Sequence, residues 1–316
     1  MQLLSRLLFL CFILSFTFQS AFAQTEAYKQ LEGRWDLTVQ QDGKELPSWL
    51  EISHSGNNTL VGRFVYAFGS ARPVAHVKYT GTSFTFSIPK QWEDGDVDMA
   101  FKGKVTEDDK MVGTMRYVDG KTYNWTGTRA PKLVYTEKPI WGAPRQLFNG
   151  ENLDGWHASG DNQWTVENGV LTSKASGSNI ISDEKFMDFK LHIEFRYPEK
   201  SNSGVYLRGR YEVQVEDNIG KAPTSTLFAG IYGFLTPNIM AAKPAGEWQA
   251  YDITLIGNRV TVIANGHAVI VDQTIPGITG GALDSNESEP GSFMLQGDHG
   301  PIEYRNIVVT PMMKAN

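Results

Sequence analysis

Four polar side chains that can carry chemistry are concentrated in the stretch NSGVYLRGRYEVQVED, residues 202–217. Strand side chains alternate between faces with a period of two, so the stretch predicts two short strands around Gly209-Arg210, each with an apolar and a polar face. The polar face is expected to carry Tyr206, Arg208, Glu212 and Gln214. A solvated face ordinarily carries Lys, Thr and Ser, so this cluster of ionisable groups indicates acid–base chemistry or ligand binding.

Other ionisable residues follow the same alternation on two further runs. In KLHIEFRY, Glu194 shares a face with two cations, and Glu303 alternates with Arg305 along the last run. His299 lies in a loop flanked by glycines, which can aim a side chain into a cleft where a near-neutral pKa is useful. If these strands are neighbours, all of these side chains line one concave surface.

Structural readings of the same residues stay open. Arg208 with Glu212 is also explained as a cross-strand ion pair of small energy, and Glu303 with Arg305 as a surface pair. Tryptophans stack on sugar rings but also fill sandwich cores. Trp156 and Trp164 are expected in the core, and Trp248 against a sugar.

The elements that must position these residues are all expected to be strands. From 27 to 130, short β runs about ten residues apart predict a small antiparallel barrel or sandwich of unclear role. Residues 131–145 hold three prolines and predict a linker. Residues 146–316 contain about eight further runs, with a hairpin signal at Asn265-Gly266, and predict a two-sheet jelly-roll sandwich.

The N-terminus and the composition point to export. Arg6, the apolar run LLFLCFILSF and Ala21-Phe22-Ala23 are typical of a signal peptide over residues 1–23, cleaved between Ala23 and Gln24. We therefore expect a periplasmic or secreted protein with no membrane span. The net charge of −6, without runs of Lys or Arg, argues against nucleic acid as a partner. Cys11 is the only cysteine, so thiolate catalysis and disulfides are excluded from the mature chain.

A set of motifs in residues 146–310 resembles the 3-keto-disaccharide hydrolase family. The motifs occur in the family's order as LFNG (147–150), LDGW (153–156), WTVENGVL (164–171), NSGVYLRG (202–209), YEVQVED (211–217), GIYG (230–233), EWQ (247–249) and GPIEYRNI (300–307). The resemblance implies a concanavalin-like sandwich with a concave carbohydrate face. It also implies activity on glycosides already oxidised to a ketone at C3, with a separate glycoside 3-dehydrogenase supplying that substrate.

A 3-keto sugar allows cleavage by elimination, because the ketone acidifies the C2 proton. One base removes this proton, the C1 substituent leaves, and water adds back to the enone, for a net hydrolysis. Such a site needs a base near C2, a cation or donors near the C3 oxygen and an acid near the glycosidic oxygen. We expect Glu194 or His299 as base, Arg208 at the enolate, and Glu212 as acid or ligand holder. Substrate binding is expected from Tyr206, Gln214, Trp248, Glu303 and Arg305.

Two other functions remain open, a non-catalytic carbohydrate-binding protein and an ordinary glycoside hydrolase. The first shares the fold, and fold alone does not fix function. The second requires two dedicated carboxylates at a defined separation. No cofactor is required by the sequence, and a structural or catalytic divalent metal is left open because scattered oxygen ligands leave no motif.

Overall fold

The computed structural model describes residues 28–56, 59–134 and 138–313. The expected signal peptide at 1–23 lies outside these residues. In the described part of the chain, no helix is long and apolar enough to cross a membrane. The chain divides into two compact units. One contains the described residues up to Glu45, Leu50–Phe64 and Pro73–Arg129, and the other contains Leu46–Trp49, Val65–Arg72 and the described residues from Ala130 onward.

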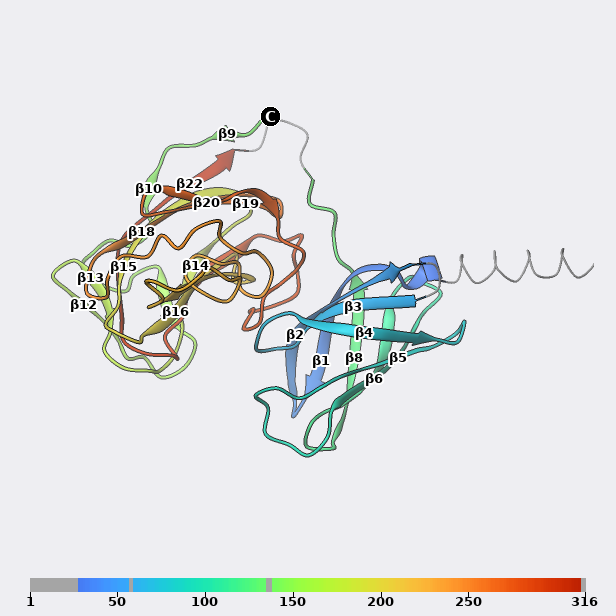
Figure 1. Ribbon diagram of the computed structural model, residues 1–316. Helices are drawn as coiled ribbons and strands as arrows, with labels where there is room; N and C mark the ends of the chain where they lie inside the picture. The colour runs from blue at the N-terminus through green and yellow to red at the C-terminus, as the bar shows by residue number, and fades with distance from the viewer. Residues whose placement is uncertain (1–27, 57–58, 135–137, 314–316) are drawn as a thin grey trace, which may run out of the picture. The chain divides into compact units, whose positions relative to one another are not determined.

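The first unit is built on a closed antiparallel barrel of eight strands (Figure 1). Its strands are β1 (Gly33–Gln41), β2 (Lys44–Ser55), β3 (Thr59–Val65), β4 (Arg72–Tyr79), β5 (Phe84–Ile88), β6 (Met99–Val105), β7 (Met111–Arg116) and β8 (Thr122–Arg129). Strand β5 illustrates the pattern, because Phe84 and Phe86 are buried and the intervening Thr85 is exposed. A Cβ atom at Gly113 would lie 2.4 Å from the Trp125 ring, so this glycine makes room for the indole.

The second unit contains two sheets. The larger, nine-stranded sheet has the order β12 (Trp164–Glu167), β13 (Val170–Ser173), β22 (Ile302–Met313), β15 (Phe189–Arg196), β18 (Gln249–Ile256), β19 (Arg259–Ala264) and β20 (His267–Thr274). Strands β9 (Ile140–Trp141) and β10 (Arg145–Gln146) also pair with β22. The smaller sheet has the order β11 (Trp156–Ala158), β14 (Ile180–Phe186), β21 (Gly291–Leu295), β16 (Asn202–Leu207) and β17 (Tyr211–Glu216).

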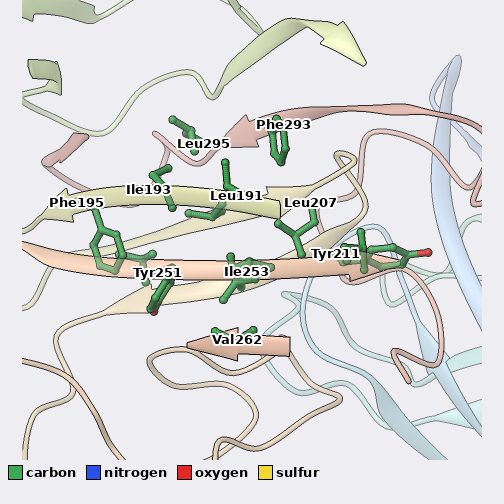
Figure 2. Close-up of a cluster of buried hydrophobic side chains, with 14 of the residues drawn as sticks. Leu191, Ile193, Phe195, Leu207, Tyr211, Tyr251, Ile253, Val262, Phe293 and Leu295 are labelled. Atoms are coloured by element: carbon green, nitrogen blue, oxygen red, sulfur yellow. The ribbon is translucent and has the colours of Figure 1, made fainter. Parts of the chain in front are cut away.

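Apolar residues from both sheets meet in one core (Figure 2). Leu191, Ile193 and Phe195 of β15 are at most 2% exposed, as are Leu207 of β16 and Leu295 of β21. Because strand residues alternate, the residues between these core positions lie on the two outer faces of the sandwich. The prediction of an all-β chain, with a jelly-roll-like two-sheet sandwich following a small barrel, is confirmed.

Two local features bear on the expected boundaries. Asn265 and Gly266 have φ of 50° and 81° and join β19 to β20, which is the turn that an Asn-Gly hairpin requires. The segment expected as a linker, 131–145, contains β9 and the first residue of β10, both paired with the last strand. The ordered sandwich therefore begins earlier in the chain than the motifs suggest.

Candidate active site

Glu212 is the centre of the outer face of the smaller sheet. Val213 and Val215 of β17 point into the core, so Glu212 and Gln214 lie on the opposite side with Gly204 and Tyr206 of β16. We call this surface the acid face. A Cβ atom at Gly204 would lie 2.5 Å from Glu212 Oε1, so the glycine gives the carboxyl room to lie across β16. Glu212 is only 4% exposed although it carries a carboxyl group.

The burial of Glu212 favours its protonated form. Tyr206 Oη lies 3.0 Å from Glu212 Oε2 and 2.9 Å from the carbonyl oxygen of Gly280. The phenol has one proton, whereas a carboxylate and a carbonyl both only accept. Tyr206 can therefore donate to only one of the two oxygens at a time. Burial raises the pKa of Glu212 to about 8, against smaller lowering effects of the Tyr206 hydrogen bond and of the His299 charge.

This raised pKa makes the stability of the sandwich depend on pH. The unfolded chain loses the Glu212 proton near pH 4.5 and the folded chain near 8, so the folded state binds more protons between these values. The stability contribution is complete below pH 4.5 and is lost as pH rises through 8. Glutamine cannot ionise, so the unfolding free energy of Glu212→Gln should rise with pH relative to that of the wild type. The difference should grow by at most about 1.4 kcal/mol per pH unit.

Urea unfolding between pH 4.5 and 8.5 measures this difference, with hydrogen exchange of peptides from 202–217 reporting on the sandwich. The gap between Glu212→Gln and the wild type is expected to widen with pH. Parallel curves for the two proteins would show that Glu212 titrates normally.

His299 lies in the loop after β21 and is paired with its neighbour. Its Nδ1 is 2.7 Å from Asp298 Oδ1, and about half of its side chain is exposed. This hydrogen bond raises the pKa of His299, and the charge of Glu212 raises it further, so the two groups are close enough to influence each other. With Nδ1 held by Asp298, Nε2 is left to exchange a proton with a ligand. The structure therefore brings Tyr206, Glu212, Gln214 and His299 together, as the sequence predicts.

Two further residues belong to this face, and the sequence analysis missed both. Tyr232 donates its backbone N–H to Glu212 O (3.0 Å), and its pKa is raised by burial and by the Glu212 charge. Gln296 follows β21, where its backbone N–H bonds to Gly204 O, and its Oε1 atom is buried without a hydrogen-bond partner. Alternation past Met294 was a usable signal for Gln296, whereas Tyr232 lies in an irregular segment that has no periodicity.

Arg208 does not lie on the acid face, and its predicted position there is wrong. The turn between β16 and β17 begins at Arg208 itself, whose φ of 54° breaks the alternation of the strand. Its guanidinium donates from Nη2 to the carbonyl of Gly257 (2.7 Å) and to Tyr211 Oη (3.0 Å), and the side chain is 1% exposed. Arg208 is thus buried at one end of the sandwich among protein acceptors.

The prediction of one shared surface is also wrong, because Glu194, Glu303 and Arg305 lie on the other sheet, with Trp248 just before its strand β18. Leu191, Ile193 and Phe195 point into the core, which puts Glu194 on the outer face of the nine-stranded sheet. We call this the arginine face. Arg305 Nε donates to Glu194 Oε2 (2.6 Å), and Arg196 pairs with Glu303. The Trp248 ring lies 3.8 Å from the Arg305 guanidinium carbon and 4.8 Å from that of Arg196. The two faces are on opposite sides of the core.

The sequence leaves a structural or catalytic divalent metal open. Among the residues that the structure describes, no three or more His, Cys, Asp or Glu side chains are grouped to hold a metal ion. Two acidic residues of the loop 284–289 pair with protein groups. Asp284 accepts from buried Arg210 Nε (2.6 Å), and Glu287, at 2% exposure, accepts from Tyr211 Oη (2.6 Å).

Comparison with known proteins finds relatives of the sandwich domain. The family model described as 3-keto-alpha-glucoside-1,2-lyase-like domain matches residues 143–310. A 3-keto-disaccharide hydrolase from Bacteroides thetaiotaomicron is 23% identical over 164 residues, or 39% of this chain and 56% of the relative. The chain thus spans about half the length of this curated relative.

Two solved structures are also similar. A protein from Parabacteroides distasonis, provisionally named a glycosyl hydrolase, is 29% identical, with a TM-score of 0.45 over 56% of this chain and 93% of its own. A β-glucanase from Bacillus licheniformis is 12% identical, with a TM-score of 0.37 over 57% of this chain and all of its own. The match of the family model extends over more than half of the 316 residues, and through residues 143–310 the chain belongs to the 3-keto-alpha-glucoside-1,2-lyase-like domain family.

Proposed function

We propose that the sandwich domain is a glycosidase-type enzyme that cleaves the glycosidic bond of 3-keto-glycosides. Family membership and the named relatives support glycosidic bond cleavage. The observation that carries the chemistry is the buried carboxyl of Glu212, whose pKa burial raises to about 8, on the same face as a histidine that a carboxylate orients. A carboxyl group held in its acid form and an oriented imidazole can serve as acid and base at two positions of a sugar.

In the proposed reaction His299 takes the C2 proton at Nε2. The electron pair of the C2–H bond forms an enolate with the C3 ketone, and then the C1=C2 double bond as the C1–O bond breaks. Glu212 gives its proton to the departing oxygen. Water then adds at C1 of the enone and a proton returns to C2, so the net change is hydrolysis.

The remaining residues of the acid face support binding and orientation. Asp298 holds the His299 ring, and Tyr206 holds the Glu212 carboxyl. Oε1 of Glu212 has no hydrogen-bond partner in the described part of the chain, so it is the oxygen that can face the substrate. We assign Gln296 to sugar hydroxyls or the C3 oxygen, because its Oε1 has no partner among the described residues. Arg208 and Gln214, both expected to contact the substrate, are bonded to protein groups instead.

Turnover of a chromogenic 3-keto-glucoside and of its unoxidised parent in D₂O tests this proposal, with both anomers tried. Release from the keto substrate alone, with deuterium at C2 of the product, is the expected result. Equal release from the parent would make the protein an ordinary glycosidase. Binding without release from either substrate would make it a carbohydrate-binding protein.

The place of action and the supply of substrate are part of the proposal. We propose that residues 1–23 direct the protein to the periplasm or the medium, and that a separate glycoside 3-dehydrogenase makes the ketone. The N-terminal sequence supports export, and the family resemblance together with the chemistry of a 3-keto substrate supports the dehydrogenase.

A further inference from the structure

The arginine face carries a pocket of about 410 Å³. It lies where β13, β15 and β22 run side by side, with Thr172 opposite Glu303 and Glu303 opposite Arg196. The pocket lies on the outer side of the larger sheet, and its lining residues do not include Glu212 or His299.

The charges that line the pocket balance. Arg196 pairs with Glu303 on one wall and Lys174 pairs with Glu167 on another. Two cations and two carboxylates leave no net charge, so the pocket favours a neutral ligand over an anion or a cation. Each pair also places hydrogen-bond donors directly beside acceptors. This arrangement suits vicinal hydroxyl groups, since each hydroxyl both donates and accepts.

The pocket also has a fixed polar side and an apolar side. The Arg196 guanidinium is held between Glu303 and the Trp248 ring, which restricts its motion before any ligand binds. Pro301 and Ile302 supply apolar surface, as the C–H groups of a sugar ring require.

Tyr197 also lines the pocket and is 1% exposed, with its ring packed beside Phe195 in the core of the sandwich. The pocket floor is therefore fixed by core packing.

We propose that this pocket is a second binding site that takes a neutral sugar unit of a larger glycan. The sugar unit bound here is not the one being cleaved, because neither Glu212 nor His299 lines the pocket. The site would hold the enzyme on polymeric or branched material while the acid face acts on a separate 3-keto unit. This role does not depend on the reaction proposed for Glu212.

Isothermal titration of the mature protein with maltotriose and with cellotriose tests the site. Both trisaccharides carry no 3-keto group, so binding is measured without turnover. We expect saturable binding of at least one trisaccharide. Glu303→Gln and, independently, Lys174→Met are each expected to weaken it by about fivefold or more, the effect of losing a charge-assisted hydrogen bond.

Glu194→Gln is the matched control, because Glu194 has the same kind of arginine partner beside Trp248 but does not line the pocket. It is expected to leave the affinity unchanged, as is Glu212→Gln on the acid face. Absence of saturable binding by both trisaccharides would overturn the proposal. Binding that Glu212→Gln abolishes and that Glu303→Gln and Lys174→Met leave intact would overturn it as well.

Discussion

Glu212→Gln is expected to lower kcat/KM on a 3-keto-glucoside by about 10²–10⁴, the usual contribution of a general acid. Glutamine has about the size of glutamate and can still bond to Tyr206, which in turn contacts the Gly280 carbonyl. The fold is therefore retained. What it loses is the proton for the departing oxygen. The loss should therefore depend on the leaving group. The loss of kcat/KM should be large for an alkyl aglycone, which needs protonation to leave, and small for an acidic phenol such as 4-nitrophenol.

The comparison of the two aglycones separates an acid from a residue that only holds the sugar. An equal loss with both leaving groups would assign Glu212 to binding and contradict its role as acid. Glu184→Gln is the control for the substitution itself. Glu184 lies in β14 of the same sheet, where it pairs with Arg145 at the protein surface, and its change should leave both rates intact.

The part of the site that the sequence predicts is the part governed by period-two alternation within one hairpin. Tyr206, Glu212 and Gln214 share a face because β16 and β17 are neighbours along the chain and pair directly. The fold class follows from the same regular signal repeated along both units. His299 was found for another reason, because the glycines on both sides mark a loop that can present a side chain.

The errors have two physical causes. Arg208 was assigned to the face on the assumption that the strand runs through it, but the left-handed backbone at Arg208 starts the turn one residue earlier. Glu194 was grouped with Glu212 on the assumption that their strands are neighbours. Instead, β15 pairs with β18 and β22 in the other sheet. Long-range strand order is set by packing of the whole sandwich, so alternation within each run contains no information about it.

The corrected position of Arg208 changes its expected role from catalysis to stability. Its guanidinium bonds to Gly257 and to Tyr211, and Tyr211 in turn donates to the buried carboxylate of Glu287. These hydrogen bonds link the β16–β17 turn to the β18–β19 turn of the opposite sheet and to the acidic loop. It also explains why a residue other than glycine is held at a φ of 54°, because three elements fix its side chain.

Arg208→Met is accordingly expected to lower the unfolding free energy of the sandwich by about 1–3 kcal/mol, the cost of leaving a buried acceptor without its donor. Methionine fills similar volume, so the loss comes from the unpaired carbonyl of Gly257 and the lost hydrogen bond to Tyr211 rather than from a cavity. The measurement is urea unfolding, followed by hydrogen exchange of peptides from 202–217. Arg259→Met removes an exposed guanidinium that pairs with Asp272 and should not move the midpoint. If Arg208→Met unfolded at the wild-type urea concentration but no longer turned over the keto substrate, Arg208 would contact the reacting sugar after all. A stability loss with near-normal turnover in the folded fraction is what a buried link between two sheets requires.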